Sequence, residues 1–155
     1  ALLIGSGTGT AAWGTPDGAR VYNSANLTVS NLVVTALTFN SERYDNGGLH
    51  STVTNTSRLT AQNAGKYLIT AHLVWAANAT GRRTTHLRLD GETYIATDVR
   101  PAIDGAVLAV SLATVYHLAA SSYVEVAVYQ NSGGDLDVIA NLNDSPEFAM
   151  QWLGP

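Results

Sequence analysis

The sequence predicts an all-β fold, in which about ten short strands form a two-sheet sandwich or jelly roll. Apolar and polar residues alternate along its longest segments, which is the pattern of strands with one buried face. Clusters of Asn, Gly, Asp and Ser, which favour turns, separate these segments. Threonine is abundant and Lys66 is the one lysine, a composition that favours strands over surface helices.

The first 18 residues differ in texture from the rest of the chain. Gly5–Thr10 contains only Gly, Ser and Thr, which is typical of a flexible linker or an extended arm. The turn-prone segment Thr15–Gly18 follows it. We therefore expect an N-terminal arm over residues 1–18 and one folded domain over residues 19–155.

Ten segments of the domain read as strands, because each is rich in β-branched, aromatic or alternating apolar residues and is bounded by turn residues. In chain order they are Arg20–Asn23, Val33–Phe39, His50–Val53, Lys66–Ala76, Arg83–Leu89, Thr93–Ala96, Ala106–Leu118, Tyr123–Gln130, Leu136–Ile139 and Phe148–Leu153. Alternation is clearest in the fourth segment, where one face would carry Tyr67, Ile69, Ala71, Leu73 and Trp75.

The segment Ala106–Leu118 is apolar or small on both of its predicted faces. One face would carry Leu108, Val110, Leu112, Tyr116 and Leu118, and the other Val107, Ala109, Ser111, Ala113 and Val115. A solvated sheet face normally shows charged residues or threonine, so the second face is expected to be covered. Another subunit is the simplest cover. A covering loop, or a register that differs by one residue, is the alternative.

Composition restricts the class of protein further. The 155 residues include 46% apolar and only 13% charged residues, about half the usual charged share, and no cysteine. Disulfides, cysteine zinc sites and thiol nucleophiles are thereby excluded. A net charge of −4 disfavours nucleic acid as a partner, and no apolar run approaches the ~20 residues of a membrane span, so membrane insertion is not expected. The low charge itself is consistent with surface buried between subunits.

Several motifs resemble the C1q/tumour-necrosis-factor jelly-roll domain over about residues 19–154. The most specific is Gly65-Lys66-Tyr67, a Gly-x-Tyr that opens a long strand after Leu59–Ala64. Others are Phe39–Asp45, His86–Gly91, and Val115–Leu118 followed by Tyr123–Val126. Leu59 stands where many members have Phe, and Met150 where they have Gly. Ala19–Asn23, Ala36–Phe39 and Ser145–Phe148 make the chain most similar to the bacterial and bacteriophage C1q-like branch.

The resemblance implies a homotrimer whose inner sheets pack about a threefold axis. The residues it places at the axis are Leu68, Thr70 and His72, then Ala109, Ser111 and Ala113, and finally Phe148, Met150 and Trp152. Three copies of His72 at the axis would form a metal, anion or pH-sensitive site. A histidine that is simply hydrogen-bonded within the interface is the plainer alternative.

No catalytic motif accompanies these features. The sequence has no HxxxH, HxH or HExxH spacing, no nucleophile elbow and no P-loop, so neither an enzyme nor a cofactor is expected. An oxygen-rich stretch offers a calcium hypothesis on Asp135, Asp137 and Asp144, although such residues are also normal in loops.

The resemblance, together with the lack of catalytic motifs, implies a non-enzymatic, homotrimeric structural or adhesion domain of a bacteriophage virion. It would decorate a capsid or cap a head or tail fibre, and host-receptor binding is one form of that role. Its partners would be itself, other virion proteins, or a receptor or glycan on the host surface. The residues predicted to contact a partner lie in predicted loops: Tyr44, Asn78, Arg82, Asn131 and Asp135. The alternative is a secreted bacterial module that recognises a glycan or a protein.

Overall fold

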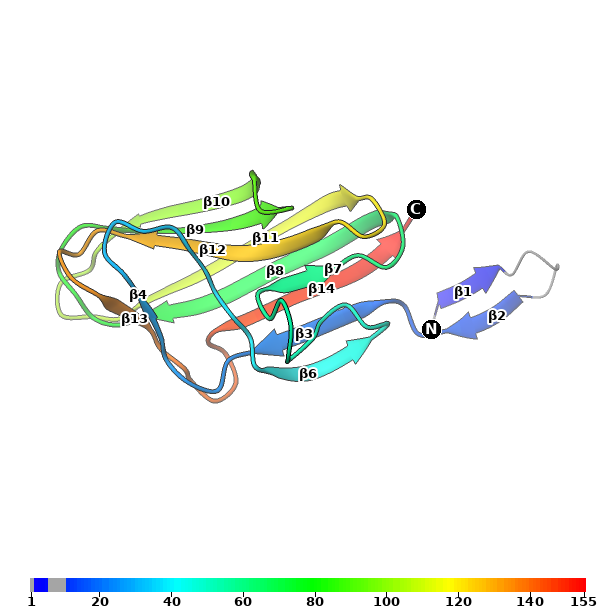
Figure 1. The fold of residues 1–155 in the computed structure, drawn as a ribbon, viewed down its shortest axis with the longest axis horizontal. Coiled ribbons are helices and arrows are strands. Elements are labelled where there is room, and N and C mark those ends of the chain that lie inside the picture. Colours follow the sequence, from blue (N-terminus) through cyan, green and yellow to red (C-terminus); the bar gives the residue numbers. More distant parts are fainter. Residues whose placement is uncertain (1, 6–10) are drawn as a thin grey trace.

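A computed structural model describes residues 2–5 and 11–155. All regular structure in the described ranges is β, and it forms two antiparallel sheets that face each other, together with a small separate hairpin (Figure 1). The hairpin consists of β1 (Leu2–Gly5) and β2 (Ala11–Gly14), which pair with one another. The predicted arm therefore contains a two-stranded sheet, and residues 6–10 of the proposed linker lie outside the described residues.

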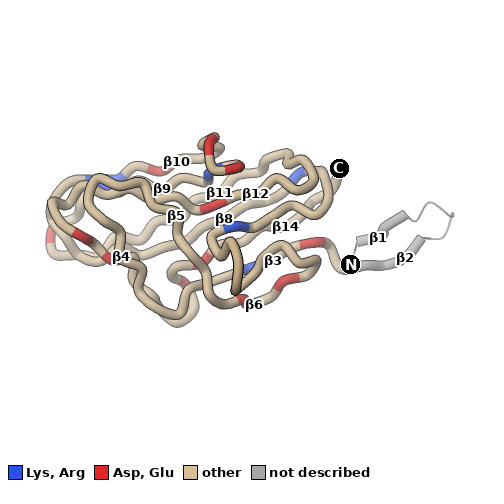
Figure 2. Tube along the Cα trace, in the orientation of Figure 1, with Lys and Arg blue, Asp and Glu red and all other residues tan. Residues whose placement is uncertain are grey.

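The larger sheet, here the β8 sheet, has seven strands. Their order is β4 (Leu27–Val29), β13 (Leu136–Val138), β8 (Gly65–Trp75), β14 (Glu147–Gly154), β3 (Gly18–Tyr22) and β6 (Ser41–Asn46). The seventh strand, β11 (Leu108–Leu118), also pairs with β8, along its whole length. Along its eleven residues β11 carries no Asp, Glu, Lys or Arg. Charged positions are sparse over the part of the chain trace that Figure 2 colours.

The smaller sheet, here the β9 sheet, has five strands. Their order is β10 (Thr93–Pro101), β9 (Arg82–Leu89), β12 (Tyr123–Gln130) and β5 (Thr35–Ala36), with β7 (Arg58–Thr60) also paired to β12. No helix of the described chain is long and apolar enough to cross a bilayer.

The core lies between the two sheets and follows the predicted alternation. Tyr67, Ile69, Ala71, Leu73 and Trp75 of β8 are all buried, while the residues between them are exposed or half-buried. Across the core, the rings of Phe39 and Phe148 lie 5.5 Å apart between centroids. Period-2 burial of this kind follows from side chains that alternate across a pleated strand.

The predicted strand His50–Val53 is wrong, because local side chains occupy the backbone donors that a strand would use. The carboxylate of Asp45 accepts hydrogen bonds from the N–H groups of Leu49 and His50. The hydroxyl of Ser51 then accepts from the N–H groups of Val53 and Thr54. Such side-chain turns compete with ladder pairing, so this segment is a loop.

Other segments differ from prediction in length. The expected strand Val33–Phe39 contracts to Thr35–Ala36, and Thr93–Ala96 extends to Pro101. Five strands were not predicted at all: β1 and β2 in the arm, and β4, β6 and β7 in the domain. The sequence of β6, SERYDN, has no apolar alternation because it lies at an edge of its sheet and pairs only with β3 in the described chain.

Candidate functional site

The side of the β8 sheet turned away from the β9 sheet, here the open face, is the main candidate site. Residues that pair directly in an antiparallel ladder point to the same side, so register alone shows which side chains share this face. Three rows cross it: Ser111, His72 and Glu147; Ala113, Thr70 and Ala149; and Val115, Leu68 and Gln151.

The open face is small and apolar along β11. Ala109, Ser111 and Ala113 are exposed, and Val115 is 55% exposed. On β8, Leu68 is 39% exposed although it is a large apolar side chain. The structure thus places six of the predicted axis residues on one exposed surface: Leu68, Thr70, His72, Ala109, Ser111 and Ala113.

The remaining three predicted axis residues lie on the other side of the sheet. Phe148 pairs with Ala71 and Met150 with Ile69, and these two side chains are 1% and 0% exposed in the core. Trp152 pairs with Tyr67, is half-buried, and donates its indole N–H to the carbonyl of Ala64 at 3.4 Å. The assignment of Phe148 and Met150 to the interface is wrong, because a single chain already buries both side chains. Trp152 lies on their side of the sheet, and its place at an interface stays a prediction.

Ala149 and Gln151 occupy the open face in their place. Glu147, Ala149 and Gln151 of β14 are polar or small, like the residues exposed on β11, but only the pairing of β14 with β8 shows that this side is outside. Side-chain size accounts for this orientation of β14: the large side chains fill the space between the sheets, and the small ones lie outside.

A depression of about 310 Å³ lies at the centre of the open face. It exists because alanine, serine and threonine side chains leave space above the backbone. Its rim includes Thr70, His72, Ser111, Ala113, Ala149 and Glu147.

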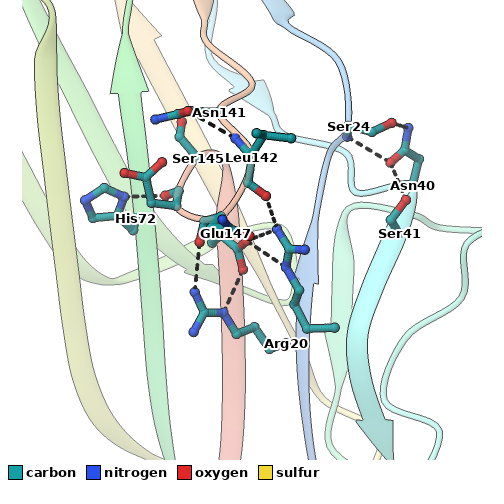
Figure 3. Close-up of polar contacts among 12 residues, drawn as sticks. Arg20, Ser24, Asn40, Ser41, His72, Asn141, Leu142, Ser145 and Glu147 are labelled. Carbon is teal, nitrogen blue, oxygen red and sulfur yellow. Dashed lines mark hydrogen bonds and ion pairs between the residues drawn. The ribbon is translucent and has the colours of Figure 1, made fainter.

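An ion cluster closes one end of this depression (Figure 3). The carboxylate of Glu147, only 5% exposed, accepts from Nε of Arg20 at 2.7 Å and from Nη2 of Arg43 at 2.8 Å. Arg43 also donates to the carbonyl of Leu142 at 2.6 Å and lies 3.8 Å from the ring centroid of Tyr22. The cluster therefore ties β3 and β6 to the loop before β14, and the buried carboxylate has two cationic partners.

His72 is engaged within its own chain. Its Nδ1 makes a hydrogen bond with the carbonyl of Asp144, and its register partners are Ser111 and Glu147. This is the contact expected of a structural histidine. It uses Nδ1, and Nε2 takes no part in it.

Four of the five predicted partner-contacting residues gather at one end of the sandwich. The N–H of Arg82, the first residue of β9, donates to Oδ1 of Asn131 at 2.6 Å. Exposed Asp135 ends the same loop as Asn131. Arg83 donates to the carbonyls of Asn78 and Thr80, which holds the 77–81 loop against this end, and its burial lowers the pKa of its guanidinium.

Tyr44 does not belong to this group. It lies in β6, paired with Arg20, at the edge of the β8 sheet. The prediction that Tyr44 is a loop residue is wrong, because the polar segment around it forms an edge strand.

The three proposed calcium ligands do not form a cluster in the described chain. Asp137 accepts from Thr28 Oγ1 at 2.7 Å and from Asn26 Nδ2 at 3.3 Å, whereas Asp135 and Asp144 lie in the loops on either side of β13. Residues 2–5 and 11–155 contain no group of three or more His, Asp or Glu side chains placed to hold a metal ion.

Known proteins share the fold at low sequence identity. Two crystal structures of murine APRIL, at pH 5.0 and pH 8.5, superpose with TM-scores of 0.68 and 0.64 at 13% and 14% identity; each comparison covers 90% of this chain and all of the other. Eiger TNF from S. frugiperda gives a TM-score of 0.61 at 13% identity, over 90% of this chain and 94% of that one. No protein-family model matches the chain, and no curated protein matches its sequence. The predicted TNF-like jelly-roll fold is therefore confirmed.

Proposed function

We propose that this chain is a non-enzymatic domain that assembles as a homotrimer through its open face and serves as a structural or adhesion domain of a bacteriophage virion. The observation that carries the assembly is the open face itself, which is exposed, small and apolar on a strand without charge. A face of this kind gains free energy when it is covered, at about 25 cal/mol for each Å² of apolar surface buried.

A second copy of the chain fits this face better than an unrelated cover. The rows of alanine, serine and threonine allow backbones to approach closely, and the carboxylate of Glu147 is already paired with Arg20 and Arg43 of its own chain. Three copies around an axis would bury the open face of each. The trimeric state is taken from the resemblance to C1q/tumour-necrosis-factor domains, which share this fold.

The virion role rests on the resemblance to the bacteriophage C1q-like branch and on the layout of a trimer. If the open faces meet at the axis, the end loops around Asn78, Asn131 and Asp135 are presented three times on one assembly. Three weak contacts to a particle protein or a host receptor then gain strength from their effective concentration.

The mass of the assembly in solution tests the first part of the proposal. Light scattering after size exclusion should give three times the 16.3 kDa chain mass at micromolar concentration. A stable monomer of 16.3 kDa would contradict it.

The location tests the second part. An antibody raised against the domain should label purified phage particles from the source culture, and mass spectrometry of those particles should find the chain. A chain found in the culture medium and absent from particles would instead favour the secreted recognition module.

A further inference from the structure

The β9 sheet carries a second depression, on the side of the molecule opposite the open face. This depression, here the β9 groove, has a volume of about 310 Å³ and is lined by Val34, Arg82, Thr84, His86, Val99 and Tyr129. It is within the size range of small-ligand sites, at the low end.

Register explains how the groove forms. Val99, Thr84 and Tyr129 form one row across three strands, so all three side chains point away from the core. Thr84 is smaller than Val99 and Tyr129 on either side of it, so the surface is hollowed above Thr84. Arg82 and His86 lie on the same face of β9, two residues before and after Thr84.

The walls of the groove are apolar and exposed. Val99 is 55% exposed and Val34 is 44% exposed, on opposite sides of the row. Exposed apolar side chains of this kind gain free energy when the C–H face of a ring covers them.

Polar atoms that make no hydrogen bond within the described chain also line the groove. The side chain of Arg82 forms no ion pair with any described carboxylate; its guanidinium lies 5.6 Å from the ring centroid of Tyr129. Among the hydrogen bonds of the described residues, neither the hydroxyl of Thr84 nor Nε2 of His86 takes part. His86 uses Nδ1 on the hydroxyl of Thr97 and stacks on Tyr94 at 3.8 Å between centroids.

The charge in the groove is of one sign. Its lining contains no Asp or Glu. Of the acids on the strands around it, Asp98 pairs with Arg100, and Glu125 with Arg88 and Arg58; exposed Asp135, at the same end of the sandwich, is not among the lining residues. Arg82 therefore presents an unneutralised guanidinium in a protein whose net charge is −4. A guanidinium with free N–H groups binds a carboxylate with paired, charge-assisted hydrogen bonds.

We infer that the β9 groove binds a carboxylate-bearing pyranose, with the carboxylate on Arg82, the ring against Val99 and Tyr129, and ring hydroxyls on Thr84 and His86. A neutral sugar lacks the group that Arg82 would bind, and an extended acidic peptide lacks the compact ring that the walls fit. The site lies on the sheet opposite the open face, so it remains accessible in the proposed trimer and does not depend on it.

Two acidic sugars and one neutral sugar test the site. Sialyllactose, a glucuronic acid disaccharide and lactose are titrated into isotope-labelled protein, and the amide shifts of Thr84, Val99 and Tyr129 are followed by NMR. At least one acidic sugar should bind about tenfold or more tightly than lactose, because lactose cannot form the charge-assisted contact. Which acidic sugar binds distinguishes a sialic acid from a uronic acid as the natural source.

Variants assign the binding to the groove. Arg82→Gln should weaken the acidic sugar about tenfold or more, and Val99→Asp, which places a repelling carboxylate on the wall, should do the same. Lys66→Gln removes the same charge from the end of β8, remote in sequence and sheet from the groove, and should leave binding unchanged. The trimer mass of each variant is measured in parallel, so a failure of assembly is distinguished from a failure of this site.

Several results would overturn the inference. They are equal binding of lactose and the acidic sugars, no binding of either acidic sugar, unchanged affinity in Arg82→Gln, and binding of a polyglutamate peptide in the groove without any sugar binding.

Discussion

Ala113 of β11 pairs directly with Thr70 of β8 in the middle of the open face, and Thr70 pairs on its other side with Ala149 of β14. The three strands thus meet in a row that has no charged side chain and no large one. A row of this composition has few groups that interact favourably with water. It suits a protein contact, because a partner can approach its backbone closely.

Replacing Ala113 with Glu should convert the assembly to monomers. In the proposed trimer the new carboxylate would be buried without a partner, which costs several kcal/mol per copy. Light scattering should then report 16.3 kDa, with a circular dichroism spectrum unchanged from that of the parent. The control is Ala120→Glu, the same change in the exposed turn after β11, which should leave the mass unchanged. A trimeric Ala113→Glu variant would place the interface elsewhere.

Replacing Phe148 with Ala should destabilise a single chain by about 3–5 kcal/mol, since it opens a cavity beside Phe39 in the core. The measurement is chemical denaturation in the Ala113→Glu background, where subunit contacts are absent. If Phe148 lay at the axis instead, its loss would have little effect on that monomer.

Replacing Glu147 with Gln should cost about 1–2 kcal/mol, because the two guanidiniums of Arg20 and Arg43 lose their shared carboxylate while remaining partly solvated. Denaturation midpoints measure the loss. Glu92→Gln, an exposed residue without an ion pair in the described chain, is the matched control and should be close to neutral. Equal midpoints for the two variants would show that the cluster contributes nothing to stability.

The stability of the protein should fall as the pH drops below about 6.5, partly because of His86. Burial first, and the neighbouring charge of Arg88 second, lower the pKa of His86 in the folded chain. As the pH falls, the unfolded chain therefore takes up this proton before the folded chain does, and the balance shifts toward unfolding until the folded pKa is passed. Thermal melts at pH 7.5 and 5.5 should show a smaller drop in Tm for His86→Gln than for the parent. Identical drops would exclude His86 as a contributor.

Replacing Gly65 with Ala should be destabilising by about 1–3 kcal/mol. Gly65 has a φ of +147°, and an added Cβ would lie 2.4 Å from the carbonyl oxygen of Gly154 and 2.5 Å from the indole nitrogen of Trp152. Gly134→Ala is the control, since nothing lies within 4 Å of its Cβ position and its φ is not in the left-handed region. A neutral Gly65→Ala would mean that the end of β14 yields easily.

The glycine of the Gly-x-Tyr motif is thus required by a contact between β8 and the end of β14, nearly ninety residues later in the chain. The resemblance identified this position from three letters, and the structure supplies the physical cause. Tyr67, two residues later, is the register partner of Trp152 in β14. Its ring is buried, which raises the pKa of its phenol, and the phenol donates to the carbonyl of Asn63.

The sequence by itself determined the fold class, the long strands and the unusual face of β11. Period-2 alternation of apolar residues predicts these properties, because it arises whenever one side of a strand faces the core. The face that carries Ala109, Ser111 and Ala113 was predictable for the same reason, because all three residues belong to one strand and the prediction did not require knowing which strand pairs with it.

Tertiary structure alone decided which side of β14 is outside, and it brought the groove of Arg82, Thr84 and Val99 together. Phe148 and Met150 are as apolar as an interface requires, and only the pairing of β14 with β8 shows that the core already takes them. Edge strand β6 and the groove have no periodic signal, since they arise where residues distant in sequence become neighbours. A pattern along one strand records burial, whereas a site made across strands depends on register.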